Sequence, residues 1–190
     1  MSYQITGLAE ADAVLDQSPF ALLAGMMLDQ QHPMEHAFRG PWKVLDRFGS
    51  IDPVAIAEAD PEKFAALCAV PPAVHRFHGA MSARLRELAR IVVDEYDGDA
   101  SKIWTEAKDG ADLLKRVQGL PGFGKQKAQI FVALLAKQAG VQPKGWKKAA
   151  GDYSLDGYRS VADVVDPESL LKVRSYKKEK KAAAKAAAEQ

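Results

Sequence analysis

Four dipeptides in this sequence pair a short polar residue with proline, and they constrain the fold more than any other local feature. Ser and Asp side chains cap the free N–H groups that begin a helix, and proline suits the first helical position because it has no N–H to satisfy. Each pair therefore predicts a helix start, and the stretches that follow show helical rather than alternating apolar spacing. The pairs are Ser18-Pro19, Asp52-Pro53, Asp60-Pro61 and Asp166-Pro167.

The rest of the sequence also favours an all-α fold. No alternation typical of a strand persists for more than a few residues, and no internal repeat is visible. We expect nine or ten helices in residues 1–175, which form one domain or one core with two lobes, followed by a basic Lys/Ala-rich tail at 176–190. That tail favours helix but has almost no apolar face, so it should dock loosely. Residues 19–31 are apolar on nearly all sides, which predicts a central buried helix.

Positive charge is concentrated along the chain, although the net charge of the whole sequence is only +1. Residues 115–151 hold eight Lys and Arg residues and no Asp or Glu, and the last twenty residues hold seven basic and two acidic residues. Soluble surfaces usually intersperse the two signs, and a solvated lysine surface would fit the tail better than this window. We therefore expect residues 115–151 to face a polyanion.

A glycine-rich turn, Leu120–Gly124, lies inside the basic window between two predicted helices that together span 110–140. Glycine permits positive φ and close approach of another backbone. The N–H groups and the dipole at the start of the second helix favour an anion. We interpret the turn as a non-specific phosphate clamp, the alternative being a tight helical corner with a glycine cap. The expected DNA-binding residues of the clamp are Gly122, Phe123, Gly124, Lys125 and Lys127.

The stretch "LPGFGKQKA" resembles the helix-hairpin-helix (HhH-GPD) motif of the DNA glycosylase superfamily typified by endonuclease III, where the pattern is L-P-G-V-G-x-K-T-A. Upstream, "SPFALLAGMMLDQQ" is similar to the buried helix of that family, which ends in a Gln that wedges into DNA; Gln30 and Gln31 fall at that place. The resemblance runs from Phe20 to about Ala139. It implies a monomeric two-lobed helical protein that binds double-stranded DNA and flips a damaged base into a cleft.

The resemblance carries the family's catalytic residues over only in part. Bifunctional members attack the sugar with a Lys that corresponds to Gln126 here, and Lys127 lies one residue further, about 100° around the helix. The resemblance therefore implies a monofunctional enzyme. The family's second residue, an Asp, would fall at Lys144. An ionised carboxylate in a cleft can activate water or stabilise an oxocarbenium-like sugar. The candidate acids are Asp156, Asp152 and Asp163, and each could instead be a surface-loop or helix-capping residue.

Polar side chains gather where the predicted buried helix ends. Buried polar groups need partners or a cleft, so we expect these side chains to form the base pocket together with Gln126. The pocket candidates from this segment are Asp29, His32 and Glu35. We expect no metal site there, because His32, Glu35 and His36 lack a further ligand at a recognisable spacing and Pro33 interrupts the helix. Trp146 and Lys147 are further DNA-binding candidates, because an aromatic ring beside a cation suits stacking on bases.

Cysteine usage limits the cofactors. The sequence has one cysteine, Cys68, so it forms no internal disulfide, and an iron–sulfur cluster held by four thiolates is excluded. We expect no cofactor. One thiol and the lack of an apolar leader favour a cytoplasmic, nucleoid-associated protein.

Three functions stay open at this stage. The first is a monofunctional DNA glycosylase that hydrolyses the N-glycosidic bond of a damaged base flipped out of duplex DNA. The second is a helix-hairpin-helix DNA- or damage-binding relative that has lost the glycosylase residues. The third is a helical protein–protein module whose basic face is incidental.

Overall fold

The structure, a computed structural model, describes residues 2–190 and contains in that range eleven α-helices, two 3₁₀ helices and no strand. The all-α prediction is confirmed. The helix count is higher than expected because three helices are short or flanked by weak signals, which hides their periodicity. They are α1 (Ala9–Gln17), α7 (Lys102–Thr105) and α10 (Trp146–Ala150).

All four polar–proline pairs begin a helix, as predicted. The helices are α2 (Pro19–Leu28), α4 (Pro53–Glu58), α5 (Pro61–Ala69) and α11 (Pro167–Ala188). In each case the side chain before the proline accepts a hydrogen bond from a backbone N–H of the first turn; the Ser18 hydroxyl, for example, accepts from the Ala21 N–H at 3.0 Å. Capping, rather than apolar content, sets these four starts.

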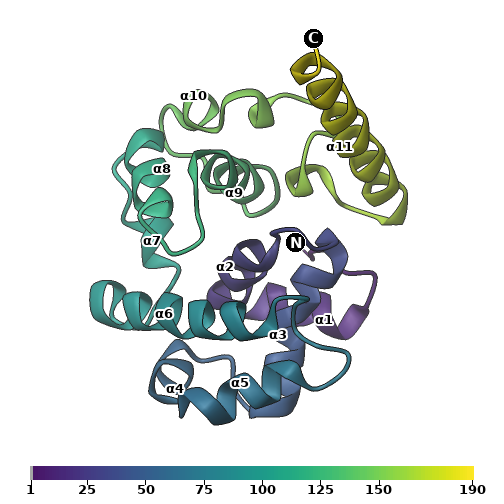
Figure 1. Cartoon of the computed structure of the whole chain (residues 1–190). Coiled ribbons are helices and arrows are strands. Elements are labelled where there is room, and N and C mark those ends of the chain that lie inside the picture. The colour runs from purple at the N-terminus through teal and green to yellow at the C-terminus, as the bar shows by residue number, and fades with distance from the viewer. Residues whose placement is uncertain (1) are drawn as a thin grey trace.

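The helices form two groups (Figure 1). One group holds α1 to α6, including α3 (Met34–Phe48) and α6 (His78–Tyr96). The other holds α8 (Gly110–Gln118), α9 (Lys125–Gln138), α10 and α11, with α7 on the connection from α6. Figure 1 shows the hairpin of α8 and α9 facing α2 across the space between the groups. This arrangement places the predicted phosphate clamp beside the end of the predicted buried helix.

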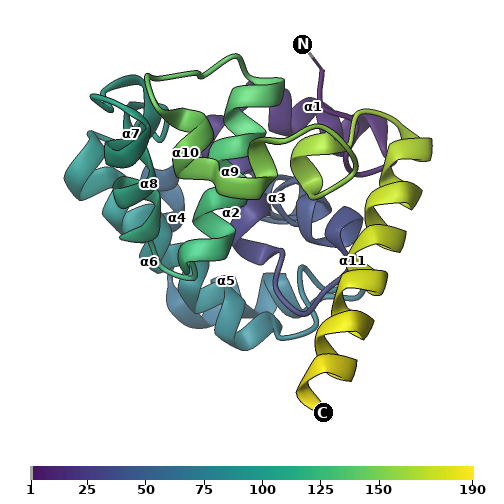
Figure 2. The same ribbon diagram turned by 90° about the horizontal axis from the view of Figure 1, so that it is seen from above.

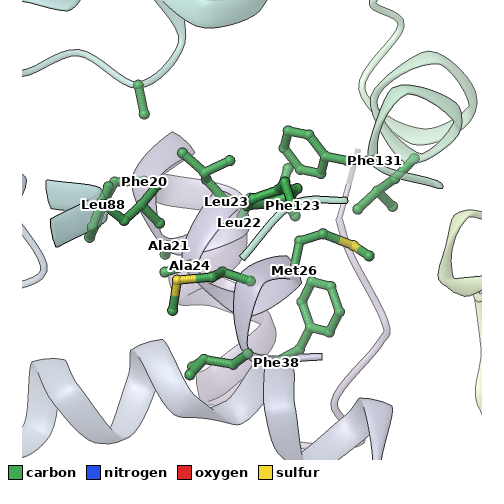
Figure 3. Close-up of a cluster of buried hydrophobic side chains, with 14 of the residues drawn as sticks. Phe20, Ala21, Leu22, Leu23, Ala24, Met26, Phe38, Leu88, Phe123 and Phe131 are labelled. Atoms are coloured by element: carbon green, nitrogen blue, oxygen red, sulfur yellow. The ribbon is translucent and has the colours of Figure 1, made fainter. Parts of the chain in front are cut away.

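Helix α2 is the centre of the core. Every residue from Phe20 to Leu28 is buried. Figure 3 shows its side chains between Phe38 of α3 on one side and Phe123 and Phe131 of the hairpin on the other. The crossing with α3 is close: a Cβ on Gly25 would lie 2.6 Å from a ring carbon of Phe38. The two helix groups therefore share one apolar core with α2 at its centre.

The segment 141–160, expected as a long loop, contains α10 and the 3₁₀ helix η1 (Gly151–Ser154), and η2 (Val161–Asp163) follows it. It is pressed against the start of α8. The Gly110 N–H donates to the Lys144 carbonyl at 2.8 Å, and a Cβ on Gly110 would lie 2.6 Å from the backbone of Gly145 and Trp146. Only glycine allows the two backbones to approach this closely.

Helix α11 continues through the expected tail to Ala188. Figure 2 shows it running along one side of the molecule, with the chain end projecting beyond the other helices. Its first half is anchored by the buried residues Ser169 and Val173 and by an ion pair of 3.0 Å between Arg174 and Glu35 of α3. Within residues 2–190, no helix combines the length and the apolar character needed to cross a membrane.

Candidate active site and nucleic-acid interface

The hairpin turn is fixed to the core by two apolar side chains. Leu120 and Phe123 are buried and anchor the turn, and Gly122 adopts φ +80. Helix α9 begins at Lys125 without a side-chain cap, and Lys125 and Gln126 are exposed. The first N–H groups of α9 thus lack a side-chain partner, and they lie at the positive end of the helix dipole. Whether the turn and Lys125 bind phosphate, as the sequence predicts, stays a prediction.

Lys127 does not lie on that outer surface, which corrects its expected contact with phosphate. Its ammonium donates to the Met27 carbonyl at 2.9 Å and lies 5.9 Å from the ring centre of Phe123. Burial lowers the pKa of Lys127 to about 8, and nearby Asp29 partly opposes that shift. The side chain therefore joins the start of α9 to the last turn of α2, where a cation is favourable.

The turn and the end of α2 also meet through Arg84 of α6. A Cβ on Gly122 would lie 3.1 Å from both Arg84 Cδ and Met27 Cγ. Arg84 donates to the Gln30 side-chain oxygen at 2.9 Å. Gln31 is exposed at positive φ, +50, and its carbonyl accepts from Arg76 at 3.3 Å. The two glutamines therefore lie near the clamp, Gln30 tied to the protein and Gln31 projecting to solvent. Nothing in the sequence pattern indicated Arg84.

Asp29 is the C-cap residue of α2, directly after Leu28. Its side chain is only 10 % exposed, and the Lys177 ammonium of α11 is 4.0 Å away. Within residues 2–190 its carboxylate accepts no hydrogen bond from a neighbour. Burial raises the pKa of Asp29, and the positive charges of Lys177 and Lys127 oppose that rise. A nearly buried carboxylate without hydrogen-bond partners is the form expected of a catalytic acid or base.

A cavity of about 400 Å³ opens beside this carboxylate, which is within the usual range of ligand pockets. Gln126 lines it, and its side-chain NH₂ donates to the Tyr153 hydroxyl at 2.8 Å. The C-terminal helix forms a large part of the wall. The α11 residues that line the cavity are Tyr176, Lys177, Lys180, Lys181 and Ala184.

The residues expected to form one base pocket divide between two cavities. Asp29 and Gln126 line the cavity just described, whereas His32 and Glu35 line a second one of about 670 Å³. Lys177 and Lys181 of α11 border both. The sequence predicted a single pocket because nothing in it indicates that α11 lies between these residues.

The residues of the second cavity hold α11 in place. Glu35 accepts from Arg174 at 3.0 Å. The His32 ring centre is 4.5 Å from that of His75, and burial lowers the pKa of His32 to about 4, so this ring is neutral near pH 7. In the part of the chain that the structure describes, no group of three His, Cys, Asp or Glu side chains is placed to hold a metal ion.

The three acids predicted to be catalytic lie elsewhere. Asp163 caps η2 and pairs with Lys137 at 2.6 Å, while its other oxygen accepts from the Arg159 N–H at 2.8 Å. Both carboxylate oxygens of Asp163 therefore already accept hydrogen bonds that hold the local fold together. This finding corrects the expectation that Asp163 is catalytic. Asp152 and Asp156 are exposed and do not line the cavity that contains Asp29.

Trp146 and Lys147 lie on α10. The Trp146 ring is half-buried and packs against the core, and the Lys147 ammonium is 5.9 Å from its centre. Lys147 itself is exposed. The packing of Trp146 leaves part of its surface for a partner, and its stacking on a base stays a prediction.

The helices α8 and α9, joined by a glycine-containing turn with no side-chain cap at the start of the second, have the form of a helix-hairpin-helix motif. The profile of the HhH-GPD superfamily base excision DNA repair protein matches residues 24–190. The chain therefore belongs to the HhH-GPD superfamily of base excision DNA repair proteins. Searches of curated proteins and of solved structures found no significant match.

The buried Lys127 predicts a specific pH dependence of stability. Its pKa is lowered from 10.5 to about 8 in the folded chain. Between these pH values the unfolded chain binds a proton that the folded chain does not, so the free energy of unfolding should rise with pH by up to about 3 kcal/mol from this group. Urea unfolding of wild type and Lys127→Met from pH 7 to 10 measures it. The rise should disappear in the variant; equal slopes would contradict the burial of the ammonium.

Proposed function

We propose that this protein is a monofunctional DNA glycosylase, which hydrolyses the N-glycosidic bond of a damaged base held in the cavity beside Asp29. The observation that carries the proposal is the Asp29 carboxylate, 10 % exposed and free of hydrogen-bond donors in residues 2–190, at the wall of a cavity of about 400 Å³. Membership of a base excision repair superfamily supplies the class of reaction.

The residues of the hairpin would hold the DNA backbone. The N–H groups at the start of α9 and the exposed Lys125 offer donors and charge to a phosphate without reading sequence. Gln30 accepts a hydrogen bond from Arg84 and Gln31 follows it at the surface, where the two side chains can fill the space that an extruded nucleotide leaves. A flipped base would enter the cavity with its sugar next to the end of α2.

Asp29 would then act on the sugar. As the bond between C1′ and the base breaks, positive charge develops on the sugar, and a nearby carboxylate stabilises that charge. The carboxylate also accepts a proton from the attacking water. The water oxygen bonds to C1′, the base leaves with the bonding electron pair and takes up a proton, and the products are a free base and an abasic site.

Lys127 would not act as the nucleophile. Its ammonium donates to the Met27 carbonyl, and it does not line the cavity. Gln126, at the place of the family's attacking lysine, bears an amide that forms no imine. The arrangement therefore favours water as the nucleophile.

The test is a panel of duplexes, each with a single deaminated, oxidised or alkylated base, incubated with the full-length protein. We expect an abasic product on at least one lesion, with strand cleavage only after alkali and no covalent complex trapped by borohydride. A trapped complex would instead show amine attack. Salt-dependent duplex binding without an abasic product on any lesion would refute the glycosylase and favour the non-catalytic binding relative.

A further inference from the structure

The wall that α11 contributes gives the cavity a strong excess of positive charge. Four cations line it, and Asp29 is the only acid among its lining residues. Lys177 lies 4.0 Å from Asp29 and balances it. The others pair with no carboxylate within the described chain, so their charge is not neutralised by protein groups. These three are Arg159, Lys180 and Lys181.

The hydrogen-bonding groups of the wall are mainly donors. Lysine and arginine side chains donate and cannot accept. The Gln126 NH₂ group is engaged by the Tyr153 hydroxyl at 2.8 Å, which leaves the amide oxygen as an acceptor. A base that offers carbonyl oxygens, together with a ring N–H for the Gln126 oxygen, matches this arrangement.

The two tyrosine rings of the cavity are the features that could favour a cation instead, through their π faces. Both rings already have a cation beside them, because the Lys180 ammonium lies 5.7 Å from the ring centre of Tyr153 and 5.8 Å from that of Tyr176. A cationic base would have to displace this ammonium or stay beside it. Because the tyrosine rings already have the Lys180 ammonium beside them, a cationic base gains little from them and is repelled by the unpaired charges of Arg159, Lys180 and Lys181.

We propose that the α11 wall selects uncharged, carbonyl-bearing damaged bases, such as products of deamination or oxidation, and rejects the cationic bases that ring N-alkylation produces. This inference rests on the proposed function, because it assigns the substrate class of the same cavity. It gives the basic C-terminal helix a role in base selection.

Binding of two matched bases tests the charge preference apart from catalysis. One duplex carries 7-methylguanine, a cation, and the other carries 7-deaza-7-methylguanine, its uncharged isostere. Both have a 2′-fluorine on the sugar, which prevents base loss. We expect the protein to bind the uncharged isostere about tenfold more tightly, a difference of about 1.4 kcal/mol in binding free energy, because the partly solvated cations of the wall repel the charged base.

Reversing one charge on α11 tests whether this helix causes the preference for the uncharged base. Lys180→Glu should lower the ratio of the two affinities to about threefold or less, since it replaces one repulsive charge with an attractive one. The matched control is Lys185→Glu, which makes the same change on the same helix but outside the cavity lining, and it should keep the wild-type ratio. Because each protein is compared on two duplexes of the same length, a general loss of DNA affinity cancels.

Distinct outcomes separate this inference from the proposed function. Equal or tighter binding of the cation by wild type, or equal ratios in Lys180→Glu and Lys185→Glu, would overturn the selection by α11 even if the protein releases bases. Failure to bind either base better than undamaged DNA would overturn it as well. A preserved preference for the uncharged isostere without abasic product on any lesion would refute catalysis and leave the selection standing.

Discussion

Replacing Asp29 with Asn should reduce the single-turnover rate of base release by about 10²–10⁴-fold, the range associated with loss of a general acid or base. Asn has nearly the same shape as Asp but carries no charge, so it neither stabilises a cationic sugar nor accepts a proton from water. Because the hairpin and not Asp29 would hold the phosphates, the affinity for duplex DNA should change little. Single-turnover cleavage assays and binding titrations on the same duplex measure the two effects separately.

The controls for this prediction are the acids that the sequence alone favoured. Asp152→Asn and Asp156→Asn change exposed carboxylates outside the cavity, and both should release base at close to the wild-type rate. Loss of activity in either variant, with Asp29→Asn still active, would move the catalytic acid to segment 152–156. The pH profile gives an independent check: because burial raises the pKa of Asp29 above 3.8, the rate should rise with pH through a midpoint above that value.

Features encoded by residues close in sequence could be predicted. The four polar–proline pairs gave the helix starts because a cap and its first turn involve only neighbouring residues. The hairpin turn could also be read, since its glycines and the free N–H groups of α9 are properties of the local backbone. The capping role of Asp163 also had a local signal, because Ser160 and Asp163 have the spacing of a capping box.

Features that depend on helices far apart in the chain could not be predicted. Asp29 meets Lys177 only because α11 returns across both helix groups, and no periodicity links positions 148 residues apart. Lys127 was placed correctly in the first turn of α9, but its direction depends on the position of α2 beneath it. Whether a lysine on the inner face of a helix donates to a carbonyl or to a phosphate depends on which segment packs against that face. The sequence of the helix itself does not specify that segment.

The hairpin packs on the core through an aromatic seat formed by Trp104, Phe123 and Phe131, which should contribute strongly to the stability of the fold. Phe131 of α9 is fully buried, and its ring meets Trp104 and Phe123 edge to face, with centres 6.0 Å apart in both pairs. Phe131→Ala removes these contacts and leaves a cavity beside α2, so the free energy of unfolding should fall by about 3–5 kcal/mol. Urea denaturation followed by circular dichroism measures this loss.

The matched control is Phe77→Ala, which removes a ring that is 43 % exposed and should cost less than about 1 kcal/mol. A double-mutant cycle between Phe123 and Phe131 should give a coupling of about 0.5–1.5 kcal/mol. Similar losses from Phe131→Ala and Phe77→Ala would show that the hairpin is not seated on the core as described. Since Phe123 belongs to the turn and Lys127 follows it by one helical turn, a loosened seat would also release the contact of Lys127 with Met27. The position of the clamp relative to Asp29 therefore depends on the same aromatic packing that stabilises the fold.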